Sequence, residues 1–309
     1  MTQRTLEIVV TCDEGYLGPL HTMLLSLRAN NRAGSIRAWI LHRGIPQLAL
    51  ESLAVFCGHI EIELAPRMVD QALFAHARSS ERYPQEMYYR MLATHVIDAD
   101  IDRVLYLDPD ILIINPLTPL FDIVLGDCVF AAASHTDAVH PATALNNMRL
   151  NTNEVYFNTG VILMDMRRAK ALIDPDEIFA FAMEHERKLL FPDQDIFNAL
   201  YGERTLPVPD QVWNYDARKY PDNIIRTGGE ATLDWVMNNT AILHFCGRDK
   251  PWRRSTAANS QRCTNTTPRS PAGYSERRAE YTADMRKGRH YSLPFCVNPV
   301  WRYAEIRAR

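Results

Sequence analysis

The 309-residue sequence lacks the features that mark several large classes of protein. It has no apolar run of about 18 residues, so no membrane-spanning helix is expected. A glutamate interrupts the short apolar run near the N-terminus, which is unlike a secretory signal peptide. The net charge is only -3, and a generally basic nucleic-acid-binding protein is therefore not expected. Hydrophobic residues make up 47% of the sequence, the composition of a folded globular protein.

Cysteine is scarce and irregularly spaced. The six cysteines form no CxxC pair and stand at positions 12, 57, 128, 246, 263 and 296. This spacing disfavours a zinc site or a disulfide framework, and it fits a reduced, cytoplasmic setting.

Charge is distributed unevenly along the chain. Residues 253–309 contain eleven arginines and one lysine against four acidic residues, whereas acidic residues outnumber basic ones over 1–252. Residues 253–290 are rich in Ser, Thr, Asn and Arg and show no apolar periodicity, which is typical of irregular segments. We therefore expect a folded domain over 1–252 and a basic, irregular tail over 253–309.

Short apolar strands alternate with helical segments in the first part of the chain. Strands are expected at 6–11, 36–41, 60–64 and 104–107, and helices over 17–27, 46–56 and 85–97. This alternation indicates parallel βαβ units and an α/β, doubly wound sheet. Ligands bind such sheets beyond the carboxyl ends of the strands, where residues 12–16 and 108–110 are expected.

The sharpest chemical feature is Asp108-Pro109-Asp110, which stands between two apolar runs. In an extended chain, residues two apart project to the same side, and Pro109 disfavours a helix at Asp108. Two carboxylates on one side repel each other, and burying them is costly unless they are paired. A divalent cation resolves both problems, and oxygen ligands suit Mg²⁺ or Mn²⁺. A solvated turn with two incidental aspartates explains this short pattern equally well.

Further polar residues lie at the ends of expected strands and helices. His244 is near the end of a strand at 241–245, and an imidazole ligand would favour Mn²⁺, although a lone strand histidine is usually a core residue. Lys250 could bind a phosphate through the compact positive charge of its ammonium group. Asp193 follows a proline in the first turn of a helix, where capping is the ordinary role. Gly160 in a buried strand indicates close approach by a ligand or another backbone.

Taken in order, these segments resemble glycosyltransferase family 8, which includes bacterial lipopolysaccharide galactosyl- and glucosyltransferases and glycogenin. The matching stretches, over roughly residues 6–252, are IVVTCDEGY, YYR, YLDPDILIINPL, YFNTGVILMDM, DQDIFNAL and HFCGRDKPW. The resemblance implies a GT-A catalytic domain over 1–252, in which a nucleotide-binding half is fused to an acceptor-binding half. It also implies metal-dependent, retaining transfer of a hexose from UDP-glucose or UDP-galactose. The implied acceptor is a glycan or lipid-linked glycan, as in lipopolysaccharide biosynthesis.

The resemblance assigns roles to individual residues. It implies a Mn²⁺ site, with Mg²⁺ as the alternative, at the DxD motif and one histidine: Asp108, Asp110 and His244. The implied contacts to the donor nucleotide are Thr11, Cys12, Asp13, Tyr16, Arg90, Asp108, Pro109, Asp110, Gly247 and Lys250. The implied contacts to the donor sugar are Asn158, Thr159, Gly160, Asp193 and Gln194. Asp193 and Gln194 are also the implied catalytic residues. We favour same-face attack, with Gln194 stabilising an oxocarbenium-like state, over double displacement.

Two positions depart from the family pattern. Gly15 stands where many members have Asn, and His135 stands where many have an Asp that binds the donor sugar, so the donor identity is open. One alternative function is a degenerate member that binds a UDP-sugar without transferring it. Another is a haloacid-dehalogenase-type phosphatase with Asp108 as nucleophile, but that motif normally opens the first strand of its fold.

Three explanations of the basic tail are open: an anchor to anionic lipid, a solubilising extension, or a shift of reading frame near codon 253. We favour a cytoplasmic protein whose tail contacts the inner face of the membrane weakly. The basic charge is accompanied by late aromatic residues, Phe295, Trp301 and Tyr303, and this combination suits a membrane surface.

We expect the full-length protein to sediment with anionic vesicles at low salt and to be released at high salt. Each Lys or Arg near such a surface contributes about 1 kcal/mol of attraction, which salt screens. A truncation to residues 1–252 is the control, and equal sedimentation of both proteins would show that the tail is not the anchor.

Overall fold

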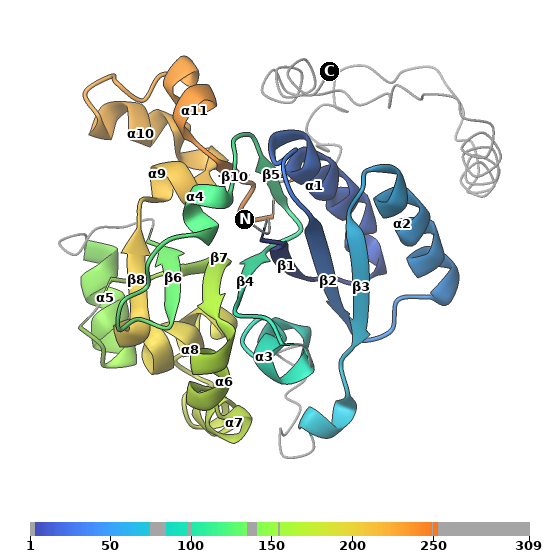
Figure 1. Cartoon of the computed structure of the whole chain (residues 1–309). Coiled ribbons are helices and arrows are strands. Elements are labelled where there is room, and N and C mark those ends of the chain that lie inside the picture. Colours follow the sequence, from blue (N-terminus) through green and yellow to red (C-terminus); the bar gives the residue numbers. More distant parts are fainter. Residues whose placement is uncertain are drawn as a thin grey trace, which may run out of the picture. The chain divides into compact units, whose positions relative to one another are not determined.

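The computed structural model describes residues 4–74, 85–97, 100–134, 141–153, 155–248 and 250–252 (Figure 1). Met1–Cys246 forms one compact unit, and the chain from Gly247 belongs almost entirely to a second. All helices and strands of the described residues lie in the first unit. The tail over 253–309, like His135, lies outside the described residues, so the predicted domain boundary at residue 252 stays a prediction.

A seven-stranded mixed sheet forms the centre of the first unit (Figure 1), in the order β3-β2-β1-β4-β7-β6-β8. Its strands are β1 (Leu6–Thr11), β2 (Ile36–His42), β3 (Glu63–Met68), β4 (Arg103–Leu107), β6 (Phe130–Ala133), β7 (Asn158–Asp165) and β8 (Thr205–Val208). Strand β7 runs antiparallel to its neighbours β4 and β6, and the other neighbouring pairs are parallel. The predicted α/β class with a mainly parallel sheet is confirmed.

The described residues of the first unit contain eleven α-helices, several of which cover the two faces of this sheet. They are α1 (Leu17–Asn30), α2 (Gln47–His59), α3 (Ala93–Val96), α4 (Thr118–Phe121), α5 (Pro141–Leu150), α6 (Met166–Leu172), α7 (Pro175–Glu184), α8 (Pro192–Tyr201), α9 (Asp210–Trp213), α10 (Tyr220–Arg226) and α11 (Leu233–Asn239). No helix within the described ranges has the length and apolar character needed to cross a bilayer.

Alternate residues of the central strands contribute to two separate hydrophobic cores, because successive side chains of a strand point to opposite faces. Ile8 and Leu105 belong to the core that contains the buried residues of α1, α2 and α4. Val9 and Tyr106 belong to the core that contains buried residues of α3, α6, α7 and α8. The apolar runs of β1 and β4 are therefore buried on both faces, which leaves the ends of the strands for chemistry.

A second, three-stranded sheet has the order β5-β10-β9 and consists of β5 (Ile111–Ile113), β10 (Ile242–His244) and β9 (Tyr215–Asp216). Strand β10 is antiparallel to β5, so that His244 lies opposite Ile111, and the N–H of Phe245 donates to the carbonyl of Asp110 at 3.1 Å. This pairing brings a late strand of the chain beside the Asp108-Pro109-Asp110 segment.

Three local expectations were wrong. The strand expected at 60–64 begins only at Glu63, because α2 continues to His59 and Glu61 then adopts a left-handed φ of 52°. The helix expected over 85–97 is a 3-10 helix (Gln85–Tyr88), a turn and the short α3, an arrangement that buries the adjacent residues Tyr88 and Tyr89 together.

The third difference concerns the segment between β4 and β5. Pro109 and Asp110 form a turn rather than the extended chain that was expected, because β5 leaves the main sheet to pair with β10. The two carboxylates nevertheless reach the same place, since each approaches the same histidine ring.

Candidate active site at the edge of the main sheet

The ends of three interior strands of the main sheet bring candidate site residues together. Thr11 ends β1, Asp108 follows β4, and Gly160 lies near the beginning of β7. Because β7 is antiparallel to β4, its amino end lies at the carboxyl ends of β1 and β4, and the N–H of Asp108 donates to the carbonyl of Gly160 at 2.8 Å. These residues therefore meet at the carboxyl ends of β1 and β4, where the sequence predicts ligand binding.

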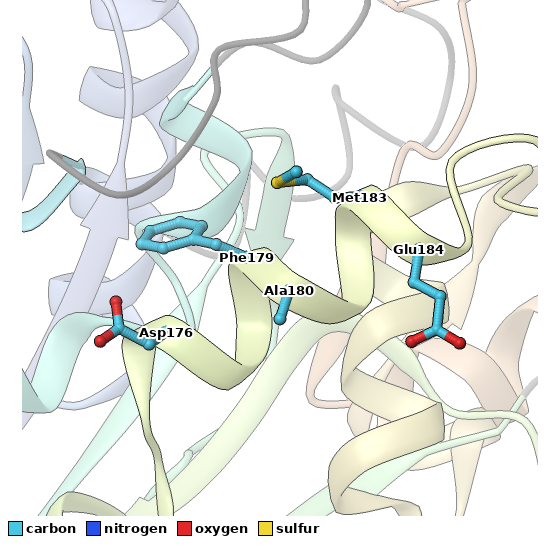
Figure 2. Close-up of a pocket in the computed structure, with 5 residues that line it drawn as sticks. All are labelled: Asp176, Phe179, Ala180, Met183 and Glu184. Carbon is cyan, nitrogen blue, oxygen red and sulfur yellow. The ribbon is translucent and has the colours of Figure 1, made fainter.

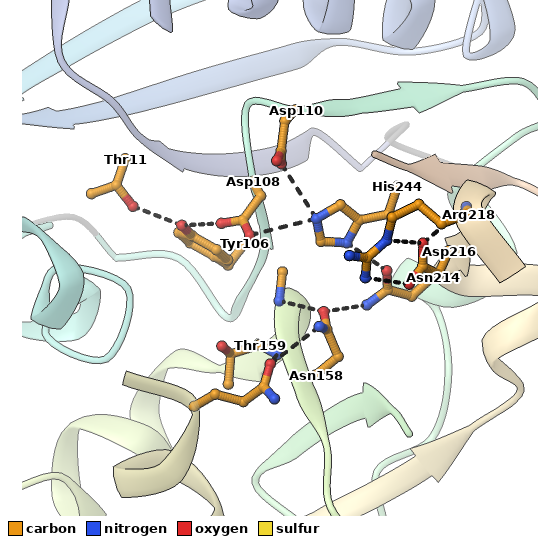
Figure 3. A network of polar contacts seen from close by, with 12 residues as sticks. Thr11, Tyr106, Asp108, Asp110, Asn158, Thr159, Asn214, Asp216, Arg218 and His244 are labelled. Atoms are coloured by element: carbon orange, nitrogen blue, oxygen red, sulfur yellow. Dashed lines mark hydrogen bonds and ion pairs between the residues drawn. The ribbon is translucent and has the colours of Figure 1, made fainter. Parts of the chain in front are cut away.

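Asp108, Asp110 and His244 form a cluster that could hold a metal ion (Figure 3). One ligand atom from each residue lies within 4.8 Å of the others. His244 Nε2 is 3.3 Å from Asp110 Oδ1 and 3.8 Å from Asp108 Oδ2. Asp110 and His244 are buried, so the structure brings together the three predicted ligands in a mostly enclosed place.

Asp108 is oriented by Tyr106, which lies on the preceding strand β4, and by Arg90. Its Oδ1 accepts from the hydroxyl of Tyr106 at 2.7 Å and lies 3.3 Å from Arg90 Nη2. Burial raises the pKa of Tyr106 well above its usual value, so the phenol stays protonated and donates a hydrogen bond to Asp108. The hydroxyl of Thr11 must then donate to Tyr106, at 2.8 Å. This arrangement leaves Asp108 Oδ2 as the oxygen that faces His244.

Burial raises the pKa of Asp108, and the positive charge of Arg90 partly offsets this increase. Burial alone would lower the pKa of His244, but hydrogen bonds with Asp110 and with Cys246 raise it to about 10. In the absence of a cation, the imidazole is therefore held as a charged partner of the carboxylates. A cation that takes Nε2 must displace this proton.

Arg90 links the carboxylate cluster to α8. Its Nη2 lies 3.2 Å from Asp193 Oδ2, and its Nη1 donates to the carbonyl and hydroxyl oxygens of Thr159 at 2.9 and 3.1 Å. Burial would lower the pKa of the guanidinium, but Asp108 and the other acids around it raise it above the usual value. Arg90 is thus a fixed positive charge between Asp108 and Asp193.

Gly160 is required by the closeness of the groups that face it. A Cβ atom at this position would lie 2.8 Å from Asp108 Oδ2 and 2.9 Å from His244 Nδ1, and closer still to His244 Cε1. The close approach that the sequence predicted at Gly160 is therefore present, and its partners are two of the predicted metal ligands.

The predicted donor-sugar residues also lie together. Asn158 Nδ2 donates to Gln194 Oε1 at 3.1 Å, and the N–H of Thr159 donates to the same oxygen at 3.4 Å. The oxygen of Gln194 therefore already accepts two hydrogen bonds. These residues join β7 to the first turn of α8, beside Asp193.

Two acids in the first turn of α8 have different roles. Asp193 is partly exposed and pairs with Arg90, whereas Asp195 is fully buried. Asp195 accepts two hydrogen bonds from Arg149 and one from the hydroxyl of Tyr156. It also accepts from the backbone N–H groups of residues 190 and 191. Asp195 thus holds α5 and α8 together, while Asp193 faces the site.

The predicted nucleotide-binding residues are divided between the two units. In the first, Asp13 Oδ1 accepts from the N–H of Tyr16 at 3.2 Å and caps the 3-10 helix Glu14–Tyr16. Burial, and then Asp13, raise the pKa of the Cys12 thiol to about 12, so it stays protonated. In the second unit, Gly247 has a left-handed φ of 83° and Lys250 lies over the ring of Trp252. The contacts of these residues with UDP stay predictions.

Sequence reasoning missed Tyr106, Asn214 and the ion pair between Asp216 and Arg218. His244 Nδ1 bonds to Asn214 Oδ1 at 2.8 Å, and Arg218 Nη2 is 2.7 Å from the buried Asp216 (Figure 3). Tyr106 interrupts the apolar residues 104–107 of its strand with a hydroxyl group, a signal that could have been noticed. Nothing in the sequence around Asn214 indicates that β9 lies beside β10.

A hollow of about 640 Å³ lies along α7 (Figure 2). It is lined by Asp176, Phe179, Ala180, Met183 and Glu184. None of the predicted site residues lines it, and it carries no group that the predicted chemistry needs.

Comparison with known proteins identifies the family of the chain. Residues 7–256 match the model of glycosyl transferase family 8, and the chain belongs to that family. General stress protein A of Bacillus subtilis (strain 168) is 26% identical over 262 residues, which are 81% of this chain and 88% of that protein. Lipopolysaccharide 1,2-glucosyltransferase of Escherichia coli is 24% identical over 165 residues, 53% of this chain and 49% of that protein. The chain thus matches about half the length of this second relative.

Solved structures show the same fold. The galactosyltransferase LgtC in complex with donor and acceptor sugar analogues has a TM-score of 0.66 at 23% identity, covering 97% of this chain and all of that chain. The bifunctional glycosyltransferase WbbM has a TM-score of 0.62 at 20% identity, covering 80% of this chain and 47% of that chain. The predicted family and GT-A fold are confirmed, and the chain is a glycosyltransferase. The phosphatase alternative receives no support, because β4 follows three other strands.

We expect Gly160→Ala to abolish Mn²⁺ binding, because the added methyl group would displace the His244 ring and Asp108 Oδ2. Gly58→Ala is the matched control, since a Cβ there meets nothing within 4 Å. That change should leave metal binding intact and stabilise α2 by about 1 kcal/mol. Calorimetry with Mn²⁺ and thermal unfolding measure both effects, and unaltered Mn²⁺ affinity in Gly160→Ala would contradict the crowding argument.

Proposed function

We propose that this glycosyltransferase moves glucose or galactose from UDP-glucose or UDP-galactose to a glycan acceptor, with Mn²⁺ in the site and retention of configuration at the anomeric carbon. The observation that carries the proposal is the connection made by Arg90. This one largely buried guanidinium contacts the carboxylate cluster through Asp108 and the predicted sugar site through Asp193 and Thr159.

The side chains fit a divalent cation. Asp108 and Asp110 supply oxygen atoms, His244 supplies Nε2, and the three ligand atoms lie within 4.8 Å of one another. A mixed set of two carboxylates and one imidazole favours Mn²⁺, whereas Mg²⁺ prefers oxygen ligands alone. When bound, the cation would neutralise the charge that grows on the leaving diphosphate.

The chain's own residues would position the donor and stabilise the reacting centre. Arg90 is held by Asp108 and Asp193, so its charge would need no reorganisation as the glycosidic bond breaks. Gln194 Oε1 already accepts hydrogen bonds from the side chain of Asn158 and from the backbone N–H of Thr159. These two bonds make the oxygen a poor nucleophile. This geometry supports same-face attack, in which Gln194 stabilises the oxocarbenium-like state, over a covalent adduct on Gln194.

The names of two relatives support the proposed acceptor class. One curated relative is a lipopolysaccharide 1,2-glucosyltransferase, and LgtC was solved with an acceptor sugar analogue. We therefore propose a glycan or lipid-linked glycan acceptor of the lipopolysaccharide type, and a cytoplasmic enzyme that reaches it at the inner membrane surface. We propose no nucleic-acid partner.

We expect Mn²⁺-dependent release of UDP from UDP-glucose or UDP-galactose in a panel of UDP-sugars. Asp110→Asn should lower this rate by about 100-fold or more, the order of a lost electrostatic contact to the reacting charge. Asp127→Asn, at an exposed aspartate, is the control that should not change it.

The same panel separates the alternatives. A degenerate family member would bind UDP and release none from any donor, and a phosphatase would hydrolyse p-nitrophenyl phosphate instead. Proton NMR of the transferred sugar tests retention, because the anomeric coupling reports the configuration. Full activity of Asp110→Asn in Mn²⁺ would refute the metal site.

We expect UDP, but not CDP, to raise the melting temperature in the presence of Mn²⁺. Asp13 would accept the N3–H of uracil, which cytosine lacks, and a site with an unpaired polar group rejects the wrong base strongly. Differential scanning fluorimetry of the wild type and Asp13→Asn measures the preference. Equal stabilisation by both nucleotides would exclude this role, leaving Asp13 only its cap of the following turn.

A further inference from the structure

A continuous chain of hydrogen bonds joins His244 to Gln194 through Asn214 and Asn158, the two asparagines labelled in Figure 3. His244 Nδ1 bonds to Asn214 Oδ1 at 2.8 Å, and Asn214 Nδ2 donates to Asn158 Oδ1 at 2.8 Å. Asn158 Nδ2 then donates to Gln194 Oε1 at 3.1 Å. Asn214 is fully buried at the end of α9, immediately before β9, and it is the member of this chain that the sequence did not predict.

Backbone groups fix the direction of the bonds at the β7 end. The N–H of Gly160 donates to Asn158 Oδ1 at 3.0 Å, and the N–H of Thr159 donates to Gln194 Oε1 at 3.4 Å. A backbone N–H can only donate, so both side-chain oxygens must face the strand. The amide nitrogen of Asn158 is then the atom that faces Gln194.

This direction extends to the predicted metal ligand. Since Asn158 presents an oxygen, Asn214 must present its amide nitrogen to it and its oxygen to His244. An amide oxygen can only accept, so His244 carries a proton on Nδ1. A neutral imidazole with a proton on Nδ1 has its lone pair on Nε2, the nitrogen that lies 3.3 Å from Asp110.

We propose that Asn214 is a positioning residue for both halves of the site. Its oxygen holds His244 in the tautomer and orientation that present Nε2 to a cation, and its amide nitrogen holds Asn158, which in turn orients Gln194. The inference rests on the metal-dependent transfer proposed above, and it adds a residue through which cation binding and donor-sugar positioning are coupled.

The test compares two substitutions that break different parts of the chain. Asn214→Ala removes both bonds, whereas Asn214→Asp keeps an acceptor for His244 Nδ1 and loses the donor to Asn158. Asn31 is the matched control, because it is also buried, accepts from the N–H of Leu117 at 2.8 Å and donates to the carbonyl of Leu27 at 2.9 Å, away from the site.

Mn²⁺ affinity is measured without turnover, from the electron paramagnetic resonance signal of the free ion, and UDP release is measured separately. We expect Asn214→Ala to weaken Mn²⁺ binding by about 10- to 100-fold, the usual cost of losing a partner that orients a ligand. Asn214→Asp should bind Mn²⁺ with near wild-type affinity but show a lower kcat at little changed donor KM. Asn31→Asp should lower only the melting temperature.

The outcomes separate this inference from the proposed function. Unchanged Mn²⁺ affinity in folded Asn214→Ala overturns the inference alone, whereas a wild type that binds no Mn²⁺ overturns both. If Asn214→Ala does not fold, Asn214→Asp provides the test. A positioning role predicts that this variant keeps its Mn²⁺ affinity and loses kcat, whereas a merely structural role does not predict that difference. Loss of both properties in folded Asn214→Asp, or of neither, overturns the inference.

Discussion

The mutual repulsion of Asp108 and Asp110 is the constraint on which the arrangement of the site depends. Two carboxylates that are largely withdrawn from water destabilise the fold unless positive charge or hydrogen-bond donors surround them. Arg90, Tyr106 and His244 provide these groups, and they come from three separate parts of the chain. The fold therefore has to bring distant segments to one edge of the sheet, and it does so through strand order rather than through a local motif.

The position of Arg90 shows how the same constraint organises the sugar side. The largely buried guanidinium that pairs with Asp108 has further N–H groups that need partners, and Thr159 and Asp193 supply the acceptors. The start of β7 and the first turn of α8 are thereby fixed relative to the carboxylates. By contrast, Asp195, only two residues after Asp193, is fully buried against Arg149 and stabilises the packing of α5 on α8.

Much of this could be predicted from the sequence, because the relevant signals are local. The apolar runs of β1, β2 and β4 and the acids that follow β4 are readable in order, and strand alternation then places their carboxyl ends together. The turn at Pro109 could not be read, since it depends on β5 pairing with β10 far along the chain. Asn214 was missed for the same reason: its partners are distant in sequence, and periodicity carries no information about them.

The predicted cation ligands belong to two different sheets. Asp108 follows β4 of the main sheet, whereas His244 ends β10 of the small one. A bound ion would act as a cross-link between the two sheets, in addition to the short chain segment 108–110 that joins β4 to β5. Because such an ion binds the native arrangement alone, it would oppose local unfolding of the small sheet by mass action. Resistance of that sheet to amide exchange and proteolysis would then vary with the metal content of the surroundings.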